Sequence, residues 1–234
     1  MNTFDLVYLH RISNASKYLT LARHYFPKAR LIYSVADLHH VRFARQATAE
    51  DRPELIALSK RVRLLECVAT AMADAVITHS PFEADLLRKE VRGAKVHVVP
   101  WTVTAQPTEV PFAKRAGVAF IGGFGHAPNQ DAARWLVSEI MPLVRKRSPN
   151  IECLLVGSET PESLLRLCDN GIVAVGHVDT LVEVFDRVRL TVAPLSYGAG
   201  VKGKVIESLA TGIPCVCTAL SGAAPGAWTR NRFD

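Results

Sequence analysis

The sequence lacks the cysteine spacing that would organise a small disulfide or zinc protein. Its five cysteines are odd in number and include no C-x-x-C pair. Cys153, Cys215 and Cys217 stand inside apolar, strand-like runs, where a thiol packs as a small apolar side chain. These features predict reduced, buried thiols in a cytoplasmic protein, and they argue against a zinc site.

Long hydrophobic runs and the common catalytic signatures are also missing. No run approaches the roughly 18 apolar residues that a membrane helix needs, and the opening MNTFDLVYLHR has no basic leader, so we expect no secretory signal. The H-E-x-x-H, G-x-S-x-G and Walker G-x-x-x-x-G-K-[ST] patterns do not occur, which disfavours a nucleoside triphosphatase. We expect no nucleic-acid partner. The net charge of +6 is the one feature that would favour such a partner, and the sequence has no aromatic RNA-binding signature.

Short apolar runs alternate with longer helical patterns along most of the chain. This alternation predicts an α/β fold with parallel sheets joined by helical crossovers. The predicted strands are Asp5–Leu9, Arg30–Val35, Asp74–His79, Lys95–Val99, Gly117–Gly122, Ile151–Val156, Ile172–Val175, Leu190–Ala193 and Ile213–Thr218. The predicted helices are Ser13–Tyr25, Pro53–Met72, Pro81–Glu90, Asn129–Arg147, Pro161–Cys168, Thr180–Arg187 and Val201–Thr211.

One segment interrupts the alternation. Residues 100–116 contain three prolines and no periodicity, so we interpret them as an interdomain linker. The linker separates a partial Rossmann-like domain, residues 1–99, from a second Rossmann-like domain, residues 117–220, and residues 221–234 form a tail. Both ends are expected to be truncated, because the first half supplies too few strands for a doubly wound domain and the tail builds no further unit.

A glycine-rich turn follows the first strand of the second half and opens a helix. Gly122, Gly123 and Gly125 would let the main chain approach a phosphate bound at the helix N-terminus. Asn129 is predicted to cap that helix. Pro128 replaces the third glycine of the G-x-G-x-x-G dinucleotide fingerprint, so a nicotinamide cofactor is not expected. A turn that only lets the helix pack is an equally good interpretation.

The segment PLSYGAGVKGKVIESLATGIPCV carries the clearest ligand-binding pattern. Its glycines would let backbone N–H groups approach a diphosphate, and lysines at a helix start oppose the helix dipole unless they meet an anion. Glu207, one turn into the helix, is placed to accept hydrogen bonds from sugar or ribose hydroxyls. The predicted donor-binding residues of this segment are Gly198, Gly200, Lys202, Gly203, Lys204 and Glu207.

Polar residues also follow the strand predicted at residues 30–35. Asp37 and His39 come at its carboxyl end, where open α/β sheets bind ligands, and they are the candidate acid/base pair. Farther along the chain, Glu66 is expected to be an ordinary surface or partner-pairing acid in the helix predicted at residues 53–72. Ser80 and Glu83 have the spacing of a capping box, in which the two residues cap a helix reciprocally.

These segments resemble glycosyltransferase family 4, whose members have the two-domain GT-B fold. In the second half the likeness runs through PNQDAARWL, LLVGSE, VGHV and VAPLSYGAGVKGKVIESLATGIPCVCT. In the first half it runs through LIYSVADLHHVRFARQA, ADAVITHSPFEADLL and VHVVPW. Together they cover nearly all of residues 5–218, and the block at residues 194–216 is the specific one.

The resemblance implies two Rossmann-like domains and transfer of a sugar from a nucleotide-sugar donor to an acceptor hydroxyl. Transfer would proceed with retention and without a metal ion or other cofactor, in polysaccharide or glycoconjugate biosynthesis. Lys202 or Lys204 would hold the donor diphosphate, and Glu207 would contact the ribose. The acceptor would be a sugar or a lipid-linked molecule, and the protein would be cytoplasmic or peripheral at the inner face of the cell membrane.

One position departs from the family pattern. The first glutamate of the family's glutamate pair should lie eight residues before Glu207, where this chain has Ala199. Two other interpretations therefore stay open. One is a nucleotide-sugar-binding module without catalysis, and the other is a sugar-nucleotide epimerase on the same fold.

Overall fold

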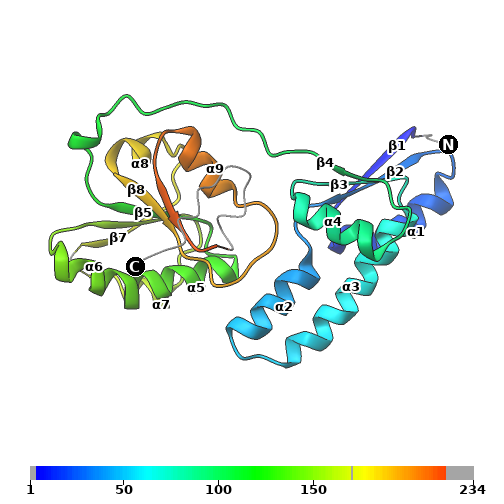
Figure 1. Ribbon diagram of the computed structural model, residues 1–234, viewed down its shortest axis with the longest axis horizontal. Coiled ribbons are helices and arrows are strands. Elements are labelled where there is room, and N and C mark those ends of the chain that lie inside the picture. The colour runs from blue at the N-terminus through cyan, green and yellow to red at the C-terminus, as the bar shows by residue number, and fades with distance from the viewer. Residues whose placement is uncertain (1–3, 170, 220–234) are drawn as a thin grey trace. The chain divides into compact units, whose positions relative to one another are not determined.

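The computed structural model describes residues 4–169 and 171–219, and it contains two compact α/β units (Figure 1). Among the described residues, the first unit comprises residues 4–102 with 197–201, and the second comprises residues 103–169, 171–196 and 202–219. The predicted tail, residues 221–234, lies outside the described residues. The five cysteines are free as expected, but only Cys153 is buried, whereas Cys215 and Cys217 are half-buried.

The first unit holds a four-stranded parallel sheet with the order β1-β2-β3-β4. Each strand pairs with the next one along the chain, so right-handed crossovers place α1, α3 and α4 on the same face, as Figure 1 shows. The elements are β1 (Leu6–His10), α1 (Ile12–Tyr25), β2 (Arg30–Val35), α2 (His39–Ala49), α3 (Glu54–Met72), β3 (Ala75–Thr78), α4 (Pro81–Glu90) and β4 (Val96–Val98).

The two faces of this sheet differ in burial. Alternate strand residues such as Leu9, Tyr33 and Val76 pack with the helices in one apolar core. On the opposite face Leu6 and Tyr8 are each 51% exposed. Parallel sheets usually bury both faces, so this half-covered sheet leaves apolar surface open beside β1.

The second unit holds a five-stranded parallel sheet with the order β7-β6-β5-β8-β9. The strand order reverses at β5 and β8, which pair directly, and such a reversal is where open α/β sheets bind ligands. The elements are η1 (Phe112–Lys114), β5 (Val118–Ile121), α5 (Ala127–Trp135), η2 (Leu136–Ile140), α6 (Met141–Arg147), β6 (Cys153–Val156), α7 (Glu162–Leu165), β7 (Ile172–Gly176), α8 (Val182–Arg187), β8 (Leu190–Ala193), α9 (Gly203–Ala210) and β9 (Cys215–Cys217).

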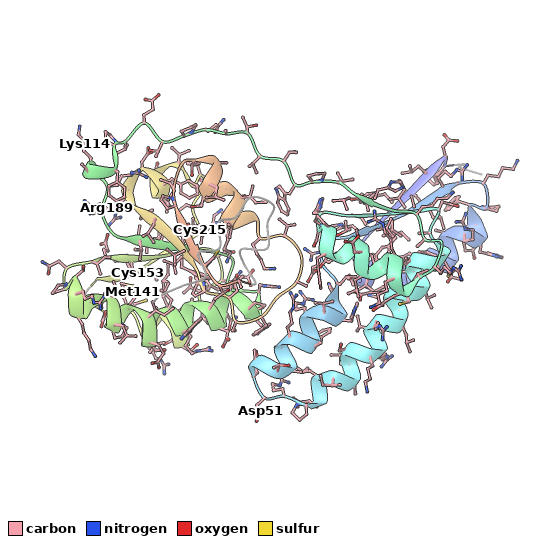
Figure 2. The ribbon with its side chains drawn as sticks, viewed as in Figure 1. Asp51, Lys114, Met141, Cys153, Arg189 and Cys215 are labelled. Atoms are coloured by element: carbon pink, nitrogen blue, oxygen red, sulfur yellow. The ribbon has the colours of Figure 1, made fainter. Side chains whose placement is uncertain are left out.

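Helices cover both faces of the second sheet. Met141 and Cys153, labelled in Figure 2, belong to a core shared by the sheet, α5, α6 and α7. A second core on the other face includes Phe185 of α8 and Leu154 of β6. The helix predicted at residues 129–147 is present as α5, a π-helical turn and α6. Pro142 lies just after the π-helical turn. Because proline lacks an N–H donor, it disturbs the helical hydrogen bonds of the turn that precedes it.

All nine predicted strands occur, with small shifts at their ends, and so do the predicted helices. The sequence does not predict α2. This helix begins after Leu38, which makes no side-chain cap, so no local start signal is present. The predicted linker is mostly extended, and Gln106 N and Thr108 N donate to the carbonyls of Ala210 and Thr211 at the end of α9.

Candidate functional site

Lys204 and the turn after β5 meet at the switch point of the second sheet. The Lys204 Nζ donates to Asn129 Oδ1 at 2.7 Å and stands 4.4 Å from the centre of the Phe120 ring. A Cβ added to Gly122 would lie 2.7 Å from the same Nζ. The glycine therefore leaves room for the ammonium group beside the main chain.

The environment of Lys204 makes its charge costly. Partial burial, together with repulsion from Lys202, lowers the pKa of Lys204 to about 8. Phe120 and Asn129 offset part of this cost, through the ring face and the amide oxygen. In the part of the chain that the structure describes, no carboxylate forms an ion pair with this ammonium group. An anionic ligand would supply the missing countercharge.

Asn129 has a different role from the one predicted. The helix α5 begins at Ala127 after the N-cap His126, so Asn129 lies inside the first turn and is not the cap. Its Nδ2 donates to Gly123 O at 2.8 Å, while its Oδ1 accepts from Lys204. Asn129 thus links the glycine turn to the lysine.

The other predicted donor-binding residues of the second unit differ in how well their surroundings suit a phosphate. Gly123 has open space, because an added Cβ would meet only Ser158 Oγ at 3.6 Å. Gly125 lies against the Glu159 carboxylate, an unfavourable neighbour for a phosphate. Lys202 is the N-cap of α9, Gly203 is its first residue, and Glu207 is half-buried in the same helix.

The structure divides the predicted donor loop between the two units. Gly198 and Gly200 belong to the first unit, whereas Lys202, Gly203 and Lys204 belong to the second. In the first unit Arg45 Nη1 donates to Gly198 O at 2.6 Å. Gly200 has a φ of 68°, and an added Cβ would lie 2.8 Å from Ala36 O. Glycine is required there both for the backbone angle and for the close approach.

Asp37 and His39 lie at the carboxyl end of β2, as predicted. One Asp37 oxygen is 3.4 Å from His39 Nε2, and the other is 3.4 Å from Arg42 Nη1. Both acid and base are partly exposed, with 18% and 19% of the side-chain area accessible. The carboxylate contacts the imidazole and orients it, an arrangement that suits a proton-transfer pair.

Glu66 is not the surface acid that the sequence suggests. This residue is fully buried, and its carboxylate accepts from His39 N at 2.8 Å and from His40 N at 3.4 Å. The His40 Nδ1 lies 2.5 Å from the same carboxylate. The local sequence gives no signal of this burial, because the neighbouring side chains of Leu64, Leu65 and Val68 are exposed.

Two further histidines lie at the carboxyl ends of strands in the first sheet, and sequence reasoning assigned them no role. His10 ends β1 and stands 3.2 Å from Ser34 Oγ, and burial with the nearby charges of Arg11 and His79 lowers the pKa of His10. His79 follows β3, and its Nδ1 is 2.7 Å from Val99 O. Their position at strand ends of one parallel sheet is the signal that topology, rather than local sequence, provides.

Residues 4–169 and 171–219 contain no group of three or more His, Cys, Asp or Glu side chains that could hold a metal ion. Within those ranges, no helix combines the length and the apolar character needed to cross a bilayer.

A known family model matches the region of the second unit. Residues 115–230 match the family model described as glycosyl transferases group 1. No curated protein sequence matches the chain.

Solved structures share the two-sheet architecture. TarM is 13% identical with a TM-score of 0.74, and the match covers 96% of this chain and 43% of TarM. Anabaena HepE in complex with UDP and glucose is 14% identical, with a TM-score of 0.64 over 94% of this chain and 60% of that one. A UDP-forming α,α-trehalose-phosphate synthase from Burkholderia xenovorans is 11% identical, with a TM-score of 0.65 and coverages of 96% and 61%.

These likenesses confirm the predicted GT-B fold, with its two parallel-sheet α/β regions. The chain spans only 43% to 61% of the length of these three structures. At such low identities the likeness shows the fold alone.

Proposed function

We propose that this chain, whose residues 115–230 match the group 1 glycosyltransferase family model, transfers a sugar from a nucleotide-sugar donor to an acceptor hydroxyl. The observation that carries the proposal is Lys204, a partly buried ammonium group held beside Gly122 at the switch point of a doubly wound sheet. Such a group gains most from a ligand with concentrated negative charge, and a diphosphate has it.

The donor class that we propose is a UDP-sugar. HepE was crystallised with UDP and glucose, and the Burkholderia synthase is UDP-forming. In this chain Lys204 would bind the diphosphate, with the main chain of Gly122 and Gly123 close by and Lys202 adding charge. Glu207 would accept hydrogen bonds from the ribose hydroxyls.

The reaction breaks the bond between the anomeric carbon and the diphosphate oxygen and forms one to the acceptor oxygen. Asp37 and His39 are the proposed pair that takes up the acceptor proton, since the carboxylate and the imidazole lie 3.4 Å apart at the carboxyl end of β2. The lysines would stabilise the negative charge that develops on the leaving diphosphate. The proposal includes retention, independence of a metal ion, a sugar or lipid-linked acceptor, a role in polysaccharide biosynthesis and a cytoplasmic or membrane-peripheral location.

A panel of nucleotide diphosphates tests the donor site. Thermal unfolding of the full chain is measured with UDP, GDP and ADP, each with EDTA and with Mg²⁺. A ligand that binds only the folded state raises the midpoint of unfolding. We expect the midpoint to rise with UDP in EDTA and to change little on adding Mg²⁺. No rise with any of the three would overturn the proposal.

A donor-binding module without transfer is the second candidate, and Ala199 favours it. This position lacks the carboxylate of the family's glutamate pair. Incubating the full chain with UDP-glucose and a panel of sugar acceptors, and measuring the release of UDP, separates the two candidates. Binding without release supports the module, and release above the uncatalysed background supports the transferase.

A further inference from the structure

Glu83 of α4 binds main-chain groups of two loops in the first unit. Its Oε1 accepts from Leu38 N at 3.0 Å and from Gly200 N at 2.8 Å, and its Oε2 accepts from Thr78 Oγ1 at 3.0 Å. Only 1% of the residue is exposed. A buried carboxylate is costly unless its oxygens are hydrogen-bonded, and here both oxygens of Glu83 accept hydrogen bonds.

The capping role predicted for Glu83 does not account for this burial. Ser80 caps α4 as predicted, since its Oγ accepts from Glu83 N at 3.3 Å. The reciprocal bond is made differently, because Ser80 N donates to Thr78 Oγ1 at 3.2 Å. The Glu83 carboxylate is therefore directed to the two loops and not to its own helix start.

The loop Tyr197–Val201 is held on both sides of Ala199. Gly200 N is bound by Glu83, and Gly198 O by the Arg45 guanidinium. An added Cβ on Gly200 would also lie 3.0 Å from Asp37 Cβ. Glu83 and Gly200 are 117 positions apart in the chain, so one carboxylate oxygen fixes a remote loop against the segment that carries the proposed acid.

We propose that Glu83 is a positioning residue of the transferase: its carboxylate fixes the main chain of Tyr197–Val201 against the Ala36–Leu38 segment, beside Asp37. This inference rests on the proposed function for its catalytic meaning. A carboxamide offers one oxygen to the same two N–H donors, so Gln at this position should keep the arrangement. Alanine or the shorter Asp should lose it.

Amide hydrogen exchange of the full chain tests the role of Glu83. We expect Glu83→Ala to speed exchange about tenfold or more in peptides covering residues 197–201 and 36–40, the effect of losing a charge-assisted hydrogen bond. Glu83→Gln should stay near wild type. Glu90→Gln is the matched control, because it removes a carboxylate from the same helix that contacts Arg63 instead.

Glu83→Asp provides a second test if the alanine variant does not fold. It keeps the charge but is one methylene too short to reach Gly200, so the same two peptides should exchange faster. Unchanged exchange there, or equally faster exchange in α1 and β2, would overturn the proposal, because the second pattern means general destabilisation. UDP titration of the wild-type chain tests the proposed function independently. If UDP does not bind, the proposed function is wrong, and the hydrogen-exchange result still decides whether Glu83 positions the loop.

Discussion

At the residue scale, Lys204 combines an unfavourable charge with a position suited to an anion. Its pKa is lowered to about 8, whereas an unfolded lysine keeps its proton to about pH 10.4. Between these values the unfolded chain binds more protons, so the free energy of unfolding should rise with pH. We predict that Lys204→Met removes this rise and raises the free energy of unfolding at pH 7 by up to about 3 kcal/mol.

Chemical denaturation of the full chain between pH 7 and 10.5 measures both effects. Lys146→Met is the control, because Lys146 is exposed on α6 and its loss should leave the slope unchanged. A Lys204→Met variant that is less stable than wild type at pH 7 would show that the ammonium group stabilises the fold. It would then be a structural residue and not one retained for a ligand.

Sequence reasoning located Lys204 and the glycine turn but not the groups that arrange them. Lysines beside glycines at a helix start are a local pattern, visible without coordinates. The link made by Asn129 to both Gly123 and Lys204 depends on a helix that begins two residues earlier than predicted. The burial of Glu66 depends on packing of α3 beneath α2, which no local pattern reports.

At the scale of elements, the glycines in the turns after β5 and β6 differ in how much space they leave for a side chain. At Gly157 an added Cβ would overlap the Gly122 carbonyl oxygen, which is main chain and cannot move aside. At Gly122 it would meet only the ends of the Lys204 and Asn129 side chains. At Gly123 the contact with Ser158 is an ordinary one.

We predict a different outcome for alanine at each of these glycines. Gly157→Ala should lower the free energy of unfolding by about 1–3 kcal/mol, as strain against the main chain does. Gly122→Ala should keep the fold but weaken UDP binding by displacing Lys204, and Gly123→Ala should behave like wild type. Urea denaturation and UDP titration of the three variants measure this order. A Gly122 variant that binds UDP normally would separate the turn from the ligand site.

The helix α2 shows why one element escaped prediction. Its N-cap, Leu38, has no side-chain acceptor. The first N–H groups are bound instead by Glu83, at Leu38, and by Glu66, at His39 and His40. Carboxylates from α3 and α4 thus replace the local cap. A helix whose start is set by distant side chains carries no start signal in its own sequence.

At the scale of the whole molecule, the strand alternation predicted both parallel sheets, but it did not predict where the Tyr197–Val201 loop belongs. That assignment depends on contacts of Glu83 and Arg45 with Gly200 and Gly198, far apart in the sequence. The exposed face of the first sheet could be predicted only in part, because it follows from the monotonic strand order and not from composition.

The free edge of β1 predicts self-association. Among the described residues no strand pairs with its outer side, and Leu6 of this strand is 51% exposed. Unpaired apolar edges favour pairing with another chain, and a lysine there opposes it. We predict that Leu6→Lys lowers self-association of the purified chain in light scattering. Leu143→Lys, at an apolar side chain 62% exposed on α6, should have no such effect.

Equal scattering of wild type and Leu6→Lys would exclude β1 as the associating surface. Reduced scattering of the Leu143→Lys variant alone would place that surface on the second unit.

The central claim is that Lys204 binds the diphosphate of a nucleotide-sugar donor, and calorimetric titration of UDP tests it most directly. Wild type, Lys204→Met and Lys146→Met are titrated at pH 7, below the pKa of about 8 at which Lys204 loses its charge. The account predicts binding to wild type and to the control, and binding about tenfold weaker or more to Lys204→Met, as loss of a charge-assisted hydrogen bond implies. Equal affinity of all three proteins, or no binding to wild type, would contradict it.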